Sequence, residues 1–198
     1  MAMKLDAGEV GRQDLFSILP ENITVNQEDN GRAVPQSEDI VEALARSILE
    51  HGQLEPAIVR RIEGHKVQLV AGYGRWRAVC HINDHLQPGQ PVKLQCRVTH
   101  CNPEEAFLRN IVENNDRAAT TPVDDAHNQR RLRERFGWTD SRISEFYGKS
   151  VSYILSLRKV LALDAPTQQA LANGNLGLAA AVTLSELSPE TRQETLEQ

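Results

Sequence analysis

A glycine turn between a predicted strand and a predicted helix is the first place in this sequence where side chains could do chemistry. The strand ends at Ala71, Gly72-Tyr73-Gly74 follows, and a helix begins at Arg75. Backbone N–H groups at a helix start lack intrahelical partners, and the helix dipole favours an anion there. Arg75 adds guanidinium donors that suit phosphate. The turn therefore predicts an anion site. The alternative is a turn that only caps a core helix, with Arg75 and Arg77 in solvent, because the ending of a P-loop is missing.

A second group of polar side chains lies on the helix predicted to begin at Pro103. Asn110, Glu113, Asn114 and Arg117 recur at helical spacing, which places all four on one face. A carboxylate beside an amide supplies the hard oxygen ligands that Mg²⁺ takes when it binds together with nucleotide phosphates. The group therefore indicates a metal and phosphate site, and the alternative is an ordinary solvated helix face.

Residues 139–163 predict a helix-turn-helix. Thr139 caps a short helix, Gly148 ends it, and a longer helix follows. The second helix of such a motif can enter the major groove of DNA, where polar side chains contact phosphates and base edges. A plain helical hairpin is the alternative. The candidate DNA-contacting side chains are Lys149, Ser150, Ser152, Tyr153, Arg158 and Lys159.

The predicted elements that would position these groups change type near residue 120. Apolar residues recur at helical spacing between a capping Ser37 and Gly52, and two β-rich runs at 57–62 and 66–71 predict a hairpin. A helix over 75–83, a strand over 92–99 and a helix from Pro103 follow, and from Pro122 every predicted element is a helix. The sequence thus predicts an α+β fold, with a small mixed α/β domain over residues 1–119 and an all-helical domain over 120–198.

Composition bounds the class of protein. The chain has 198 residues, a net charge of −5 and three cysteines without the spacing of a zinc site or a disulfide framework. No apolar run could cross a bilayer and the first residues do not form a signal peptide, so we expect a cytoplasmic protein without a membrane partner. Residues 57–117 and 124–160 each carry a net charge of +3, and both ends are acidic. DNA responds to such local charge, but charge alone favours the alternative of an ordinary solvated surface.

Several of these motifs together resemble the ParB family of partition proteins. The resemblance covers about residues 15–190 and rests on motifs that occur in the family's order. The N-terminal domain is similar in Ser37-Glu38-Asp39-Ile40, Gly52-Gln53-Leu54-Glu55-Pro56, Leu69-Val70-Ala71-Gly72 and Arg75-Trp76-Arg77-Ala78. Glu113-Asn114-Asn115-Asp116-Arg117 resembles the family's second phosphate and metal motif, and Gly148-Lys149-Ser150 with Leu157-Arg158 resembles its helix-turn-helix.

What the resemblance implies is a DNA clamp that depends on CTP and Mg²⁺. Such proteins bind a centromere-like DNA site, close as homodimers around the DNA, slide, reopen after slow CTP hydrolysis, and act with a Walker-type partition ATPase. Glu113 and Asn114 would hold the metal, and no catalytic residue is assigned. The implied nucleotide-binding residues are Gln53, Leu54, Pro56, Gly72, Tyr73, Gly74, Arg75, Arg77, Asn110, Glu113, Asn114 and Arg117.

The sequence departs from the family's pattern in the glycine turn. The family places an acid and two consecutive arginines after the first glycine, whereas this chain has Tyr73, Gly74 and Arg75. Nucleotide binding is therefore expected more firmly than turnover. The alternative hypothesis is a DNA-binding repressor or adaptor with a degenerate nucleotide pocket and no CTPase activity, and a small-molecule kinase on the same scaffold is a third. The end of the chain at Gln198, without a separate dimerisation domain, suggests either a truncated chain or a compact relative from a plasmid or phage.

Overall fold

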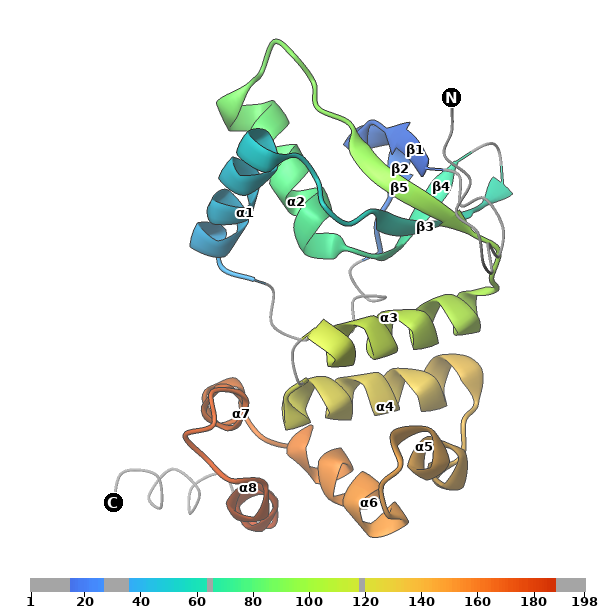
Figure 1. Cartoon of the computed structure of the whole chain (residues 1–198). Coiled ribbons are helices and arrows are strands. Elements are labelled where there is room, and N and C mark those ends of the chain that lie inside the picture. The colour runs from blue at the N-terminus through green and yellow to red at the C-terminus, as the bar shows by residue number, and fades with distance from the viewer. Residues whose placement is uncertain (1–14, 27–35, 64–65, 118–119, 188–198) are drawn as a thin grey trace, which may run out of the picture. The chain divides into compact units, whose positions relative to one another are not determined.

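The computed structural model describes residues 15–26, 36–63, 66–117 and 120–187, and of Asp116 and Arg117 it describes the backbone alone. The chain divides into two compact units, which separate between Arg109 and Asn110. The first is a mixed sheet with helices and the second is helical (Figure 1), so the α+β prediction is confirmed. In the described residues no helix has the length and apolar character needed to cross a membrane.

The first unit is built on a five-stranded sheet with the strand order β1-β5-β3-β4-β2. β3 pairs antiparallel with β4, which confirms the hairpin predicted from the two β-rich runs. β1 runs antiparallel to β5, whereas β3 with β5 and β2 with β4 are parallel pairs. The strands are β1 (Leu15–Ile18), β2 (Ile23–Thr24), β3 (Ala57–Arg61), β4 (Val67–Ala71) and β5 (Leu94–Thr99).

Two helices, α1 (Glu38–His51) and α2 (Tyr73–His81), pack on the sheet and on each other. Ala45 and Ile48 of α1 and Ala78 and Val79 of α2 share one core with Val59, Leu69 and Leu94 of the strands. Gly52 ends α1 with a positive φ of 76°, as its position predicts, because a residue without Cβ adopts that backbone without strain. A short 3₁₀ turn η1 (Pro20–Asn22) and a π-helical turn η4 (Ile82–Leu86) complete the regular structure described in this unit.

Helix α3 (Pro103–Arg117) begins as its sequence predicts. The Asn102 side chain accepts a hydrogen bond from the Glu105 backbone N–H at 2.8 Å, and the Glu105 carboxylate accepts one from the Asn102 N–H at 3.1 Å. This reciprocal pair satisfies two backbone donors at the helix start. The division between the two units falls inside α3, whereas the domain boundary predicted at 119/120 lies further along the chain and stays a prediction.

In its described residues the second unit continues with five helices, and capping side chains set the starts of the first four. Thr121, Thr139, Ser150 and Asp164 each accept a hydrogen bond from a backbone N–H two or three residues into the helix that follows. Their core joins Val123 and Ala126 to Leu157, Val160, Leu171 and Leu184. The helices are α4 (Pro122–Phe136), α5 (Asp140–Tyr147), α6 (Val151–Val160), α7 (Ala165–Ala172) and α8 (Leu178–Ser185).

Candidate nucleotide and DNA sites

The turn from β4 into α2 requires glycine at position 72. Gly72 is the N-cap of α2 with φ 97°, in the left-handed region. A Cβ at this position would lie 3.0 Å from the Cβ and 3.2 Å from the Cα of Ala57. The first helical hydrogen bond runs from the Trp76 N–H to the Gly72 carbonyl oxygen at 3.0 Å. The backbone N–H groups before Trp76 therefore lie outside the hydrogen-bond pattern of the helix. The local geometry is that of a helix start that can receive an anion.

Arg75 lies against the loop that follows α1. The residue is only 8% exposed, and its Nη1 donates to the carbonyl oxygens of Glu55 and Pro56 at 2.9 and 2.8 Å. The Glu55 carboxylate is 3.6 Å away. The interpretation in which both arginines of the turn lie in solvent is therefore wrong. Arg75 joins the glycine turn to residues 53–56, the segment that the resemblance places near the base.

The three predicted base-proximal residues have different environments. The Gln53 amide donates to the carbonyl oxygens of Glu55 and Gln95 and accepts from the Gln95 N–H, with all three distances between 2.8 and 2.9 Å. Gln53 thus fastens the loop to β5. Leu54 is 87% exposed, whereas Pro56 is half-buried. Of the three, Leu54 alone has a largely exposed side chain.

Arg77 is held by the segment that precedes α1. Its Nη1 donates to the Gln36 carbonyl oxygen at 2.6 Å, and its Nη2 forms an ion pair with the Glu38 carboxylate. The Gln36 side chain lies over Gly74, where an added Cβ would come within 2.3 Å of Gln36 Oε1. Sequence reasoning missed Gln36, because nothing in its neighbours' pattern indicates contact with a turn nearly forty residues away. Tyr73 stacks on Trp76, with ring centroids 5.7 Å apart.

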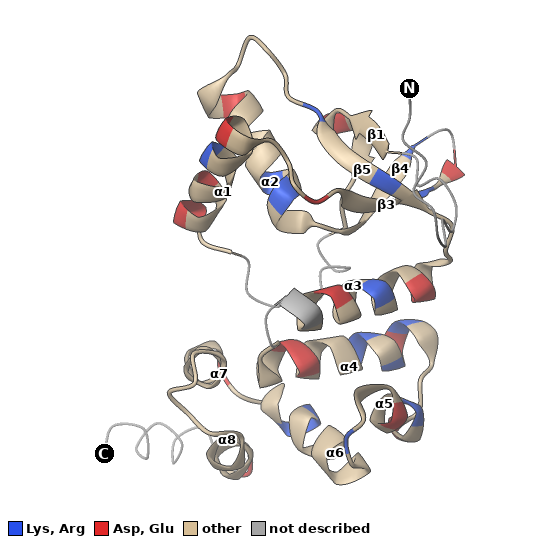
Figure 2. Cartoon of the chain, viewed as in Figure 1, with Lys and Arg blue, Asp and Glu red and all other residues tan. Residues whose placement is uncertain are grey.

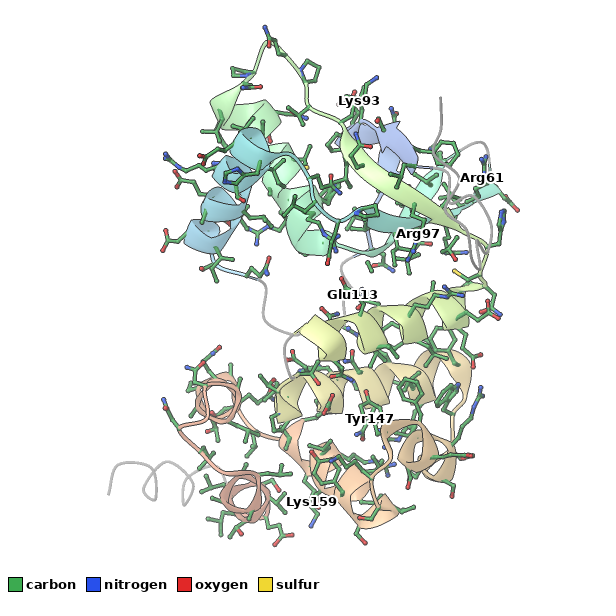
Figure 3. All side chains as sticks on the ribbon, in the orientation of Figure 1. Arg61, Lys93, Arg97, Glu113, Tyr147 and Lys159 are labelled. Atoms are coloured by element: carbon green, nitrogen blue, oxygen red, sulfur yellow. The ribbon has the colours of Figure 1, made fainter. Side chains whose placement is uncertain are left out.

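The predicted polar face of α3 is partly buried. Asn110 and Asn114 are 5% and 8% exposed, and the Asn114 Nδ2 donates to the backbone oxygen and to Oδ1 of Asn110 at 3.0 and 2.9 Å. The expectation of an ordinary solvated face is wrong for these two amides. Glu113 is half-buried on the same helix (Figure 3), and the side chain of Arg117 lies outside the described residues.

Glu113 and Asn114 fit a role as partial ligands of a metal ion. The Asn114 NH₂ group is turned toward Asn110, so the oxygen of that amide is the end that a cation could use. Within the described residues no group of three or more His, Cys, Asp or Glu side chains could form a complete protein cage. A carboxylate and an amide oxygen suit Mg²⁺, which completes its octahedron with phosphate oxygens and water. These two residues could hold Mg²⁺ on a bound nucleotide but do not form a stand-alone site.

The helix-turn-helix predicted over residues 139–163 is present in the second unit. Gly148 ends α5 in the left-handed conformation with φ 60°, and the Ser150 Oγ accepts a hydrogen bond from the Tyr153 N–H at 3.2 Å. The Ser144 hydroxyl donates to the Lys149 carbonyl oxygen at 2.5 Å and braces the turn. Ile154, Leu157 and Val160 bury the inner face of α6. The second helix thus has a fixed start and a fixed inner face.

The six predicted DNA-contacting side chains are not equally accessible. Lys149, Ser150 and Ser152 are exposed, as predicted, whereas Tyr153 is partly buried and packs against the helical core. The Lys149 Nζ lies 5.8 Å from the centre of the Tyr153 ring. The expectation that Tyr153 is an exposed contact is therefore wrong, because its aromatic body is needed in the core between α6 and its neighbours.

Arg158 and Lys159 are exposed but already have ionic partners. The Arg158 Nη2 lies 2.7 Å from Oδ1 of Asp140, which also accepts from the Arg133 Nε at 2.8 Å. The Lys159 Nζ lies 2.5 Å from the Glu186 carboxylate beyond α8, and Figure 3 shows Lys159 at the outer side of α6. The two cations at the C-terminal end of α6 therefore serve first as links to α5 and α8.

The two domain comparisons decide the family. A model of the ParB N-terminal domain matches residues 5–115, and a model of the ParB helix-turn-helix domain matches residues 118–198. The chain belongs to the ParB family. The resemblance inferred from the motifs is thereby confirmed.

Individual ParB relatives agree with this assignment. The chain is 28% identical over 177 residues to a probable chromosome-partitioning protein ParB of Pseudomonas putida, covering 88% of this chain and 58% of that protein. It is 28% identical over 191 residues to a nucleoid occlusion protein of Listeria innocua, covering 96% of this chain and 64% of that protein. The chain thus spans about three fifths of the length of these curated relatives.

A solved ParB structure shares the fold. The C-terminally truncated chromosome-partitioning protein ParB from Caulobacter crescentus, complexed to the centromeric parS site, matches with a TM-score of 0.54 and 25% sequence identity. The match covers 92% of this chain and 91% of that one. The relatives include partitioning and nucleoid occlusion proteins, and one is bound to centromeric DNA.

The departure from the ParB motif at position 74 has a structural counterpart. The family's arginine at this position would carry a Cβ into contact with the Gln36 amide, whereas Gly74 leaves room for that amide. Gln36 Oε1 is also among the buried polar atoms without a hydrogen-bond partner in the described structure. An arginine at position 74 would therefore require the end of the Gln36 side chain to move.

A second feature that the sequence did not predict is a polar cluster of Asn115, Thr120 and Asp125, near the start of α4. The Thr120 Oγ1 lies within hydrogen-bond distance of Asp125 Oδ1, at 2.8 Å, and of Asn115 Oδ1, at 2.6 Å. Burial raises the pKa of Asp125, and the hydrogen bond from Thr120 offsets only part of that rise. The pKa of Tyr147 is also raised, mainly by burial and next by the charge of nearby Asp125. The phenol of Tyr147, labelled in Figure 3, therefore stays neutral. The spacing of residues in the sequence does not indicate that Asp125 of α4 lies near Tyr147 of α5, because the two are distant in the chain.

Proposed function

We propose that this ParB-family chain is a DNA-binding partition protein that acts as a CTP- and Mg²⁺-dependent clamp in plasmid or chromosome segregation, with slow CTP hydrolysis. It would bind double-stranded DNA at a centromere-like or operator site, form a homodimer, act with a Walker-type partition ATPase, and work in the cytoplasm on the nucleoid or a plasmid. Support comes from the ParB membership and from the local geometry of its motifs.

One observation carries the proposal: the glycine turn is built around Gly72 with a buried arginine beside it. The positive φ of Gly72, and the 3.0 Å that would separate an added Cβ from the Cβ of Ala57, restrict this position to glycine. Arg75 is fixed to two backbone carbonyls at the edge of the turn, so part of its entropy is already lost before a ligand binds. A preorganised cation beside helix-start amides favours phosphate.

The remaining proposed nucleotide contacts divide by chemistry. Gly74, Tyr73 and Arg77 would contact the triphosphate with Arg75, and residues 53–56 would lie near the base. Glu113 and Asn114 would hold Mg²⁺, with Asn110 orienting Asn114 and Arg117 supporting the phosphates. When bound, the metal would neutralise phosphate charge. Tyr73 stands in place of the family's acid and supplies no carboxylate that could act as a general base, which favours slow hydrolysis.

A second candidate function is a DNA-binding repressor or adaptor without CTPase activity. The specific observation in its favour is that Arg77 is engaged by Gln36 and Glu38, and that Gly74 replaces a second guanidinium. Both features weaken the electrostatic stabilisation of a phosphoryl-transfer transition state. The helix-turn-helix would then act without a nucleotide switch.

Cysteine crosslinking with a parallel phosphate-release assay separates the two functions. Cys80 and Cys101 are replaced by serine, and Cys96 stays because it is fully buried and burial raises its pKa to about 11. Single cysteines are then introduced at exposed positions of the first unit, such as Asn22, Ser47 and Gln87. Each variant is treated with a bifunctional maleimide, with and without CTP, Mg²⁺ and a DNA site selected from a random pool.

The clamp predicts that at least one position crosslinks two protomers only when CTP and DNA are both present, with slow release of phosphate. DNA binding that is unaffected by CTP, together with no nucleotide-dependent crosslink at any position, would establish the adaptor instead. Rapid phosphate release would contradict the part of the proposal that concerns Tyr73 and Gly74.

A further inference from the structure

Two apolar side chains are exposed on the outer face of α6. Val151 and Leu155 are each 41% exposed, and their separation of four residues places them on the same side of the helix. The other aliphatic side chains of this helix, Ile154, Leu157 and Val160, are fully buried. Single exposed leucines are common on protein surfaces, but an exposed pair at the start of the second helix of a helix-turn-helix has a specific position.

The polar groups of α6 are largely engaged within the protein. The Ser150 Oγ accepts from the Tyr153 N–H, and the Ser156 Oγ donates to the Ser152 carbonyl oxygen at 2.9 Å. Arg158 and Lys159 form ion pairs with Asp140 and Glu186. The polar side chains in the C-terminal half of α6 are therefore engaged, whereas Val151, Ser152 and Leu155 of its N-terminal half are exposed.

The charge around this apolar pair suits DNA. The helix from Val151 to Val160 contains no acidic residue, Lys149 immediately precedes it, and Figure 2 shows blue but no red on α6. Phosphates could therefore approach the helix without repulsion from its own side chains. The floor of the major groove offers one apolar group at its base edges, the 5-methyl group of thymine.

We propose that Val151 and Leu155 are specificity-determining residues that contact thymine methyl groups in the major groove. This inference rests on the proposed DNA-binding function and adds to it what the bound site must contain. The side chains four residues apart lie on successive turns of α6 and would contact thymines at nearby base pairs. The exposed Lys149 and Ser152 would then position the helix on the DNA backbone rather than select the sequence.

Replacing thymine by uracil tests this contact at a single methyl group. A DNA site is first selected from a randomised duplex pool with the full chain. Each thymine of that site is then replaced, one at a time, by deoxyuridine, which removes the methyl group and keeps every hydrogen-bonding atom. Affinity is measured for the wild type, Val151→Ala, Leu155→Ala and a control, Leu49→Ala, whose side chain is 37% exposed on α1.

We expect uracil at one or two positions to weaken wild-type binding about fourfold, the loss associated with one buried methyl group. Leu155→Ala or Val151→Ala should abolish the sensitivity at one of these positions, and Leu49→Ala should keep it. If the wild type binds the selected site but tolerates uracil at every position, the inference is wrong while DNA binding stands. If the wild type selects no site and binds no duplex, the proposed function fails together with the inference.

Discussion

Arg158 holds both carboxylate oxygens of Asp140, with its Nη2 2.7 Å from Oδ1 and 2.9 Å from Oδ2. Asp140 is the first residue of α5 and also accepts from the Arg133 Nε of α4 at 2.8 Å. One carboxylate therefore links three helices of the helix-turn-helix unit. A negative charge in the first turn of α5 also complements the helix dipole. We therefore infer that Arg158 fixes the position of α6 against α5.

Arg158→Ala should lower the stability of the helical unit by about 1 kcal/mol, a value limited by the half-exposed position of the guanidinium. This corresponds to a decrease in melting temperature of about 4–8 °C for a unit of this size. The slope of log affinity against log salt for DNA should stay close to that of the wild type. Thermal melts and a fluorescence-anisotropy salt series measure both quantities. A slope reduced by about one phosphate contact with unchanged stability would make Arg158 a backbone contact instead.

The same carboxylate predicts a dependence of stability on pH. Burial by itself raises the pKa of Asp140, but hydrogen bonds from Arg133 and Arg158 outweigh burial and hold the pKa below its usual value. A lowered folded-state pKa stabilises the protein at neutral pH, and this contribution is lost as pH falls below the ordinary aspartate range toward the folded-state pKa. Urea unfolding of the wild type and Asp140→Asn should differ by about 1 kcal/mol at pH 7, and this difference should shrink as the pH falls below the ordinary aspartate range. A difference that is constant with pH would contradict the ionic account.

Gly72→Ala should destabilise the first unit by more than 1 kcal/mol, because alanine is strained at φ 97° and its Cβ would press on Ala57. Gly89→Ala is the matched control, since a Cβ there meets nothing within 4 Å and its φ is not in the left-handed region. Urea unfolding followed by circular dichroism measures both variants. Equal stability of the two variants would show that the turn relaxes freely.

The sequence was informative wherever the signal was local. The hairpin of β3 and β4, the Asn102–Glu105 capping pair, and the helix ends at Gly52, Gly137 and Gly148 follow from spacing and from glycine or capping chemistry. These features depend on neighbours within a few residues, so they can be predicted from the sequence. The order β1-β5-β3-β4-β2 does not follow in this way, because three of its four pairings join segments distant in the chain.

The candidate site was predictable in residue type but not in environment. Gly72 and Arg75 form a turn at the start of α2 as expected, yet the contacts of Arg75 with Glu55 and Pro56 carry no sequence signal. The partners of Arg158 and Lys159 were likewise unforeseen, because an exposed cation and an ion-paired one have the same periodicity. The contact of Gln36 with Gly74 was missed for the same reason. Tertiary contacts therefore determine which of the predicted side chains are available to bind a ligand.

Glu113→Gln should remove most of the gain in CTP affinity that Mg²⁺ provides, because it takes one charged oxygen ligand from the proposed metal site. We expect a tenfold or greater loss in the presence of Mg²⁺ and little change in EDTA, in line with the 1.5–3 kcal/mol typical of interactions with charged groups. Glu104→Gln, in the first turn of the same helix, should behave as the wild type. Equal losses with and without Mg²⁺ would assign Glu113 a structural role.

Calorimetric titration of the whole chain is the most direct test of CTP binding at the glycine turn. The wild type and Arg75→Ala are each titrated with CTP, ATP, GTP and UTP in the presence of Mg²⁺. We expect CTP to bind in preference to the other three, and Arg75→Ala to weaken CTP binding about 10–100-fold through loss of a charge-assisted phosphate contact. A thermal melt of the variant checks that its first unit is folded. Absence of heat with any nucleotide, or unchanged CTP affinity in a folded Arg75→Ala variant, would contradict the nucleotide-switched account.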